Sequence, residues 1–103
     1  MKVILIYITN PSRKEAVKIA EHLLQKKLIA CANIYGKTEG LYRWKGKLAR
    51  HGEYVLLAKT KSTNFGKVKE EVENMHSYTI PCIIKIPASA NKKYFDWLMG
   101  EIK

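Results

Sequence analysis

One histidine and two cysteines carry most of the metal-binding chemistry available to this chain. His76 lies in a polar connection just past an expected helix and close to the next expected strand. Copper and zinc favour imidazole, with thiolate as the softer companion, and Cys31 could pair with a histidine as such a thiolate. One histidine does not close a site, so a metal would need a ligand from a neighbouring chain or would bind weakly. The plainer interpretations are a surface or helix-terminal histidine and a small buried thiol.

The sequence contains several aromatic side chains that the core of a small domain does not require. Tyrosine and tryptophan suit interfaces, because each joins a large apolar body to one polar group. A base-stacking surface for RNA is the competing interpretation, but the expected central strands are mostly aliphatic and no Lys/Arg-Gly-Phe signature is present. The side chains in question are Tyr42, Trp44, Tyr78, Tyr94 and Trp97.

Motifs typical of enzymes are missing from the sequence. It has no Gly-x-x-x-x-Gly-Lys loop, no Gly-x-Gly-x-x-Gly turn, no Gly-x-Ser-x-Gly elbow and no Cys-x-x-Cys pair. No acid–base pair or activated nucleophile can be named. We therefore expect a protein that is not an enzyme.

The net charge and the cysteine content limit which classes of partner and which cellular compartment we expect. Lysine and arginine total 19 against 9 aspartates and glutamates, a formal net charge of +10. This excess raises nucleic acid or an anionic membrane as partners, but the charges are scattered rather than banded, so a well-charged surface is the simpler interpretation. The apolar run Val3 to Ile8 is too short for a signal core or a membrane span. We expect no membrane partner, no nucleic acid, and reduced thiols in a cytoplasm.

The hydrophobic pattern predicts one α+β domain over residues 1–103. Ser12 and Glu15 have the spacing of a capping box, and the helix that follows carries an apolar stripe that includes Leu24, with His22 off the stripe and solvated. The expected elements are a buried strand over 3–8, a helix from Ser12 to about Lys27, a hairpin over 28–60, a helix capped by Ser62 or Asn64, an edge strand over 81–87 with a proline at each end, and a last helix capped by Ser89 or Asn91.

This order of elements predicts a ferredoxin-like βαββαβ sandwich with an extended β-hairpin and a C-terminal helix. Its first and third strands are central, and these are the two with unbroken apolar runs. Both faces of those strands are apolar, whereas the two crossover helices cover one face. An apolar patch of that size is seldom left exposed to solvent on a monomeric protein. We therefore expect a homo-oligomer that packs sheet to sheet and exchanges hairpin arms, with Gly46 at the reversal.

A set of collinear motifs resembles the CutA family, also called divalent-cation tolerance proteins. Each motif alone is weak, but together they span nearly the whole chain. They are Leu28-Ile-Ala-Cys-Ala-Asn-Ile34, Tyr42-x-Trp44-x-Gly46-Lys-Leu48, Glu53, Lys59-Thr60, His76-x-Tyr78-x-x-Pro81 and Tyr94-x-x-Trp97.

The resemblance implies a cytoplasmic homotrimer of ferredoxin-like subunits, related in fold to PII-type signalling proteins and linked to copper and other divalent metals. It implies no known reaction. Lys59, Tyr78 and Trp97 match family positions around a cleft between subunits, and we extend that cleft to Tyr42 and Trp44. A PII-like trimer that senses a small molecule in the cleft is the alternative function, and a basic nucleic-acid-binding module is the third.

Departures from the family pattern affect the metal site. Some members are thought to hold copper with a cysteine at the end of the first strand and two consecutive histidines. Here those positions are Ile8, Met75 and His76, and the glutamate that commonly follows Pro81 is Cys82. Cys82 and His76 flank the same short loop, so Cys82 is a candidate substitute ligand. We expect weak binding of copper or another divalent metal at His76 with Cys82 or Cys31.

Overall fold

The computed structural model describes all 103 residues and contains a four-stranded antiparallel sheet with three helices. The sheet has the order β2-β3-β1-β4, so the first and third strands are central, as a ferredoxin-like sandwich requires. No helix is both long enough and apolar enough to cross a membrane. The elements are β1 (Lys2–Asn10), α1 (Arg13–Gln25), β2 (Cys31–Trp44), β3 (Lys47–Thr60), a short 3-10 helix (Ser62–Asn64), α2 (Phe65–Met75), β4 (Ile83–Ser89) and α3 (Lys92–Glu101).

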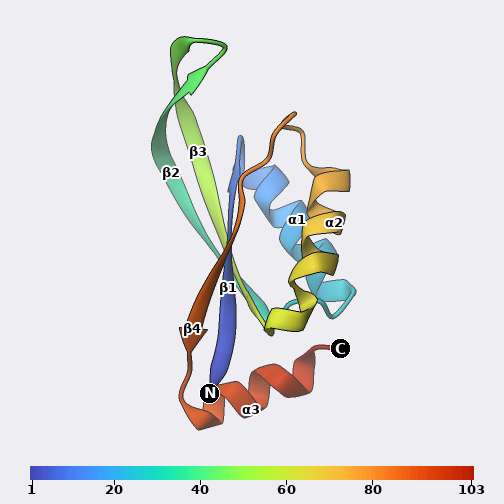
Figure 1. Ribbon diagram of the computed structural model, residues 1–103. Helices are drawn as coiled ribbons and strands as arrows, with labels where there is room; N and C mark the ends of the chain where they lie inside the picture. The colour runs from blue at the N-terminus through green and yellow to red at the C-terminus, as the bar shows by residue number, and fades with distance from the viewer.

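Figure 1 shows α1 and α2 side by side on one face of the sheet, while α3 crosses the end of the sheet near the N-terminus. The side chains of β1 alternate between the faces. Ile4, Ile6 and Ile8 are 0–3% exposed because they pack beneath α1 and α2. The main core therefore lies between the sheet and these two helices.

The other face of the sheet remains largely uncovered within one chain. Leu5 and Tyr7 of β1 lie opposite Ile86 and Ile84 of β4, and Tyr7 also lies opposite Leu57 of β3. Ile84 is 49% exposed and Ile86 is 37% exposed. One end of this face is covered by α3, whose Leu98 is buried against Val3 and Ala30. This uncovered region is called the open face below.

The hairpin of β2 and β3 extends well beyond the rest of the sheet (Figure 1). Lys45 and Gly46 form its turn, and both have positive φ angles, of 51° and 79°. Glycine adopts such angles without a steric penalty, so the prediction of a reversal at Gly46 is confirmed. A register shift between Tyr35 and Thr38 bends the long ribbon partway along its length.

Several predicted helix ends and caps differ from those observed. Helix α1 ends at Gln25 rather than near Lys27, and Leu24 is 40% exposed, so it does not belong to the buried stripe. Asn64 is the residue before α2, but its side chain makes no capping bond there. It turns inward and donates to the Leu28 carbonyl (3.1 Å) and to the Thr60 hydroxyl (3.2 Å). The residue before α3 is Asn91, again without a side-chain cap.

The last strand also differs at its ends. It begins at Ile83, two residues after Pro81, and Pro87 lies within it rather than at its end. The edge position of the strand is confirmed, since β4 has a neighbour on one side only. That position tolerates a proline because a missing N–H can face away from the ladder.

His22 is held by a carboxylate rather than simply solvated. Its Nε2 lies 2.6 Å from Glu71 Oε1, and Lys26 Nζ lies 3.3 Å from the same oxygen. These contacts, with His22 the larger cause, hold the pKa of Glu71 below its usual range. The cluster therefore joins α1 to α2 through a carboxylate whose charged form is favoured by folding.

Replacing Glu71 by glutamine is expected to lower stability in a pH-dependent way. A lowered pKa in the folded state stabilises above the ordinary glutamate pKa and loses this effect as pH falls through the lowered value. The difference in urea midpoint between wild type and Glu71→Gln is therefore expected to be full near pH 6 and to shrink as the pH falls below the ordinary glutamate pKa. The matched control is Glu73→Gln, because Glu73 pairs only with exposed Lys69; an equal loss in both variants at every pH would contradict the assignment.

Candidate functional site between the hairpin and the Ser77–Cys82 loop

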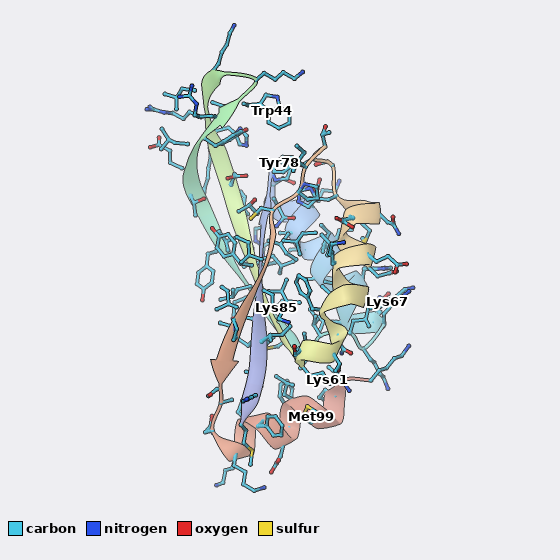
Figure 2. All side chains as sticks on the ribbon, viewed as in Figure 1. Trp44, Lys61, Lys67, Tyr78, Lys85 and Met99 are labelled. Carbon is cyan, nitrogen blue, oxygen red and sulfur yellow. The ribbon has the colours of Figure 1, made fainter.

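A cavity of about 570 Å³ lies where the outer half of the hairpin faces the loop that follows α2. Figure 2 shows Trp44 on the hairpin next to Tyr78 on this loop. We call it the hairpin cavity. Its lining comes from β1, from both arms of the hairpin and from the loop: Tyr7, Thr9, Gly40, Leu41, Tyr42, Trp44, Glu53, Ser77, Tyr78, Thr79, Ile80 and Cys82.

Tyr78 is the centre of a hydrogen-bond network in this cavity. Its hydroxyl donates to Glu53 Oε2 at 2.9 Å, and the same hydroxyl lies 3.1 Å from His51 Nε2. On the other side of the imidazole ring, the Tyr42 hydroxyl lies 3.0 Å from His51 Nδ1. All these bonds are made when His51 carries its proton on Nε2 and accepts from Tyr42.

Burial, followed by the hydrogen bond to Glu53, raises the pKa of Tyr78 well above its usual value. The phenol therefore keeps its proton across the physiological range and acts as a donor to Glu53. The Glu53 side chain is only 14% exposed, so the bond shields a carboxylate that has no lysine or arginine partner. The network places the Glu53 carboxylate in the wall of the cavity and connects it through the Tyr78 hydroxyl to the His51 imidazole.

His76 closes the end of α2 and is fully buried, with a side-chain exposure of 0%. Its Nε2 donates to the Thr9 carbonyl at 2.7 Å, and its Nδ1 accepts the Tyr78 backbone N–H at 3.0 Å. The interpretation as a surface histidine is wrong, and the helix-terminal interpretation is confirmed. Because both ring nitrogens bond to the backbone, a metal ion held by His76 would have to displace one of these bonds.

Glu15 supports the same loop. Its backbone N–H donates to the Ser12 hydroxyl at 3.1 Å, as the capping-box spacing predicts. Its carboxylate, however, accepts from the Ser77 N–H (3.2 Å) and the Ser77 hydroxyl (3.0 Å) instead of returning to the cap. The start of α1 thus fixes the loop that carries Tyr78.

Cys82 lines the hairpin cavity together with Thr9. Burial raises the pKa of the Cys82 thiol. His76 bonds to the Thr9 carbonyl, and Thr9 lines this cavity with Cys82, so the structure brings these two predicted ligands into the same region. A thiol must lose its proton to bind a metal, so the raised pKa makes any metal binding at Cys82 more pH-dependent.

Cys31 lies at the other end of the sheet. It is paired with Lys59, which lies opposite Leu5 on β1, whereas His76 contacts Thr9, four residues further along that strand. Four residues of strand span about 13 Å, so Cys31 and His76 of one chain do not share an ion. Both cysteines are free thiols.

The predicted cleft residues fall into two groups within one chain. Tyr42, Trp44 and Tyr78 line the hairpin cavity. Lys59 and Trp97 instead flank Tyr94 beside Cys31: Lys59 Nζ is 5.9 Å from the Tyr94 ring centroid, and the Trp97 ring centroid is 5.5 Å from it. The Tyr94 hydroxyl lies 2.9 Å from Cys31 Sγ, and burial with this contact raises the pKa of Tyr94 to about 12.

Comparison with known proteins gives the family. Residues 4–101 match the family model described as CutA1 divalent ion tolerance protein. The chain belongs to this family. A divalent-cation tolerance protein CutA from Archaeoglobus fulgidus is 46% identical over 94 residues, which cover 90% of this chain and 91% of the relative. A chloroplastic CutA protein from Arabidopsis thaliana is 35% identical over 101 residues, 97% of this chain and 56% of that protein.

Solved structures agree with this assignment. The structure of the CutA protein from Archaeoglobus fulgidus, described as periplasmic, has a TM-score of 0.95 at 42% identity and covers 98% of this chain and 99% of that chain. The chain is thus a member of the CutA1 family with the family's fold over essentially its whole length.

Within this CutA1-family chain, the sequence interpretation missed His51 as a site residue and did not assign a role to Glu53. The two residues lie two positions apart on β3, and side chains at that spacing point to the same face of a strand. This spacing was the feature of the sequence that could have indicated a pair of adjacent donor side chains. His51 Nε2 and Glu53 Oε2 lie 3.8 Å apart, and both bond to the Tyr78 hydroxyl, so an ion held by this pair would have to displace that hydroxyl.

The donor set of one chain does not complete a metal site. The structure contains no group of three or more histidine, cysteine, aspartate or glutamate side chains that could hold an ion together. His51 and Glu53 provide one nitrogen and one oxygen donor, which suits copper or zinc as a partial site. A closed coordination shell would need further donors from water or from another subunit.

Proposed function

We propose that this protein is a non-catalytic, homotrimeric divalent-cation tolerance protein that binds copper or another divalent metal in the hairpin cavity, at the contact between subunits. The observation that carries this proposal is that Glu53, whose Oε2 lies 3.8 Å from His51 Nε2, lines one cavity together with Cys82, beside an apolar sheet face that one chain leaves uncovered.

Assembly is supported by the amount of apolar surface outside the core. The open face carries Ile84 and Ile86, and Tyr35 on β2 is 54% exposed. The outer hairpin adds Leu41 and Leu48, at 51% and 69% exposure. Covering these apolar groups with a partner would stabilise the assembly by roughly 25 cal/mol for each Å² of apolar surface removed from water. A closed ring of copies buries both regions at once.

Metal binding in the cavity is supported by donor chemistry. Imidazole and carboxylate bind copper and zinc, and a thiolate adds affinity for softer ions. Tyr78 holds the Glu53 carboxylate in place and Tyr42 holds the His51 ring, which are the roles that outer partners of metal ligands have. The set of His76, Cys82 and Cys31 stays a prediction, and the following titration tests it together with the new pair.

Copper titration of His51→Gln and Glu53→Gln is expected to give affinities at least about tenfold weaker than wild type, the scale on which even loss of an outer partner acts. Binding would be followed by calorimetry with Cu²⁺ and Zn²⁺. The matched control is His22→Gln, which removes a histidine that pairs with Glu71 away from the cavity. Cys82→Ser, Cys31→Ser and His76→Gln complete the series.

Three outcomes would contradict this assignment. Unchanged affinity in both His51→Gln and Glu53→Gln would remove the pair from the metal site. A loss confined to His76→Gln and the cysteine variants would support the set predicted from the sequence instead. Loss in every variant including His22→Gln would indicate unspecific binding to the surface.

A PII-like trimer that senses a small molecule is the second candidate, favoured by the size and aromatic lining of the cavity. A volume of about 570 Å³ exceeds what a single ion needs and is typical of small-molecule sites. Wild-type protein that binds no divalent metal in the titration above would favour this candidate. We propose a cytoplasmic location, where both thiols stay reduced, and no nucleic-acid or membrane partner.

A further inference from the structure

A second cavity, of about 460 Å³, lies on the helix side of the sheet between β4, β1 and the start of the 3-10 helix. We call it the lysine pocket. Register explains why its polar side chains converge: Lys2 is opposite Ser89, Ile4 opposite Pro87 and Ile6 opposite Lys85, so Lys2, Lys85 and Ser89 share one face. Figure 2 shows Lys85 in the space between β4 and α2.

The pocket collects positive charge without any neutralising partner. Its lining residues are Lys2, Val3, Ile4, Ser62, Lys85, Pro87, Ala88 and Ser89, none of which is acidic. The ion pairs of the protein involve neither Lys2 nor Lys85. Lys85 Nζ instead donates to the Ser62 hydroxyl at 3.2 Å and lies 5.7 Å from the Phe65 ring centroid. These contacts orient the ammonium group but leave its charge uncompensated.

The floor of the pocket strengthens its attraction for an anion. Val3 and Ile4 are only 6% and 3% exposed, so one side of the pocket is closed by the protein core rather than by water. Charge interactions next to a low-dielectric wall are stronger than those on an open surface. The remaining groups are donors: two ammonium groups and two serine hydroxyls, which match an anion that has several oxygens.

We propose that the lysine pocket binds the phosphate groups of a small phosphorylated molecule. Lys2 and Lys85 are separated by four residues along the paired strands, or about 13 Å between backbone positions. Two long flexible side chains that start this far apart suit an extended anion such as a diphosphate better than a single compact ion. The pocket is also too large for inorganic phosphate alone.

A small molecule fits this pocket better than a nucleic acid does. Sites for single-stranded nucleic acid combine a positive groove with aromatic side chains on which bases stack, and the lining of the lysine pocket has no aromatic residue. Tyr42 and Trp44 of the hairpin line the other cavity. This ligand would therefore be independent of the metal ion proposed for the hairpin cavity.

Calorimetric titration with pyrophosphate at constant ionic strength tests the proposal. Wild type is expected to bind one pyrophosphate per chain, and Lys2→Gln/Lys85→Gln is expected to bind at least about tenfold more weakly, because each charge-assisted bond contributes substantially. The control is Lys14→Gln/Lys18→Gln, which removes the same net charge from exposed positions of α1. Its affinity is expected to stay within about twofold of wild type. Circular dichroism melting would show that all three proteins are folded.

Further titrations distinguish the sources of phosphate. Inorganic phosphate is expected to bind more weakly than pyrophosphate, and Lys85→Arg is expected to retain most of the affinity, because arginine also binds phosphate oxygens. Equal loss in the pocket and control variants would reduce the effect to net charge and overturn the proposal. Absence of wild-type binding at millimolar pyrophosphate, or tighter binding of an oligonucleotide that is insensitive to Lys2→Gln/Lys85→Gln, would overturn it as well.

Discussion

Leu57→Asp is expected to leave the protein as monomers of 11.9 kDa, whereas the homotrimer that we propose for wild type would have about three times that mass. Leu57 is at the centre of the open face, opposite Tyr7 on one neighbouring strand and Asn33 on the other. An ionised carboxylate at this position would have to be buried without a partner in any sheet-to-sheet assembly, at a cost of several kcal/mol. Size-exclusion chromatography with light scattering measures the mass directly.

The control for this experiment is Leu24→Asp, which places the same charge on a leucine of α1 that is 40% exposed on the helical side. Its mass is expected to equal that of wild type. A wild-type protein that elutes as a monomer would contradict the assembly outright. A Leu57→Asp variant that keeps the full mass would show that subunits associate through another surface.

His76→Ala is expected to lower the free energy of unfolding by about 3 kcal/mol, although the residue lies in a loop. The substitution removes a fully buried ring and leaves the Thr9 carbonyl and the Tyr78 backbone N–H without their partners. The same ring packs 4.8 Å, centroid to centroid, from Tyr78. Urea unfolding at a fixed protein concentration measures the loss, since oligomers unfold in a concentration-dependent way.

The matched comparison is His22→Ala, because the His22 side chain is 31% exposed and its contact is a single ion pair. Its cost is expected to be about 1 kcal/mol or less. An unchanged urea midpoint for His76→Ala would mean that His76 does not hold the loop. In that case a role as a metal ligand would become the better explanation for the residue.

Prediction from sequence succeeded for elements whose signal is local or strictly periodic. The reversal at Gly46 and the apolar central strands both follow from neighbours in the chain. The predicted caps were less successful. Ser12 caps α1, but Asn64 is drawn into the core by the Leu28 carbonyl, 36 residues away.

The site was harder to predict because its residues meet only through the tertiary fold. His51 lies on a strand with no metal-binding motif around it, and nothing local indicates that Tyr78, 27 residues later, would contact it. His76 has the residue type of a metal ligand, yet its ring nitrogens bond to Thr9 and Tyr78. A sequence shows which side chains could bind a metal, but it does not show which of their donor atoms are already hydrogen-bonded to other groups.

The sequence by itself determined the order of strands and helices, the position of the hairpin and the presence of a second apolar face, because alternation and turn chemistry act between near neighbours. Only the tertiary structure decided that Glu53 and His51 face Tyr78, that Cys31 is far from His76, and that Lys2 and Lys85 share a pocket. The physical reason is that strand register and sheet twist set the distances between segments remote in the chain, and these distances decide which polar groups pair with each other and which remain free to bind a ligand.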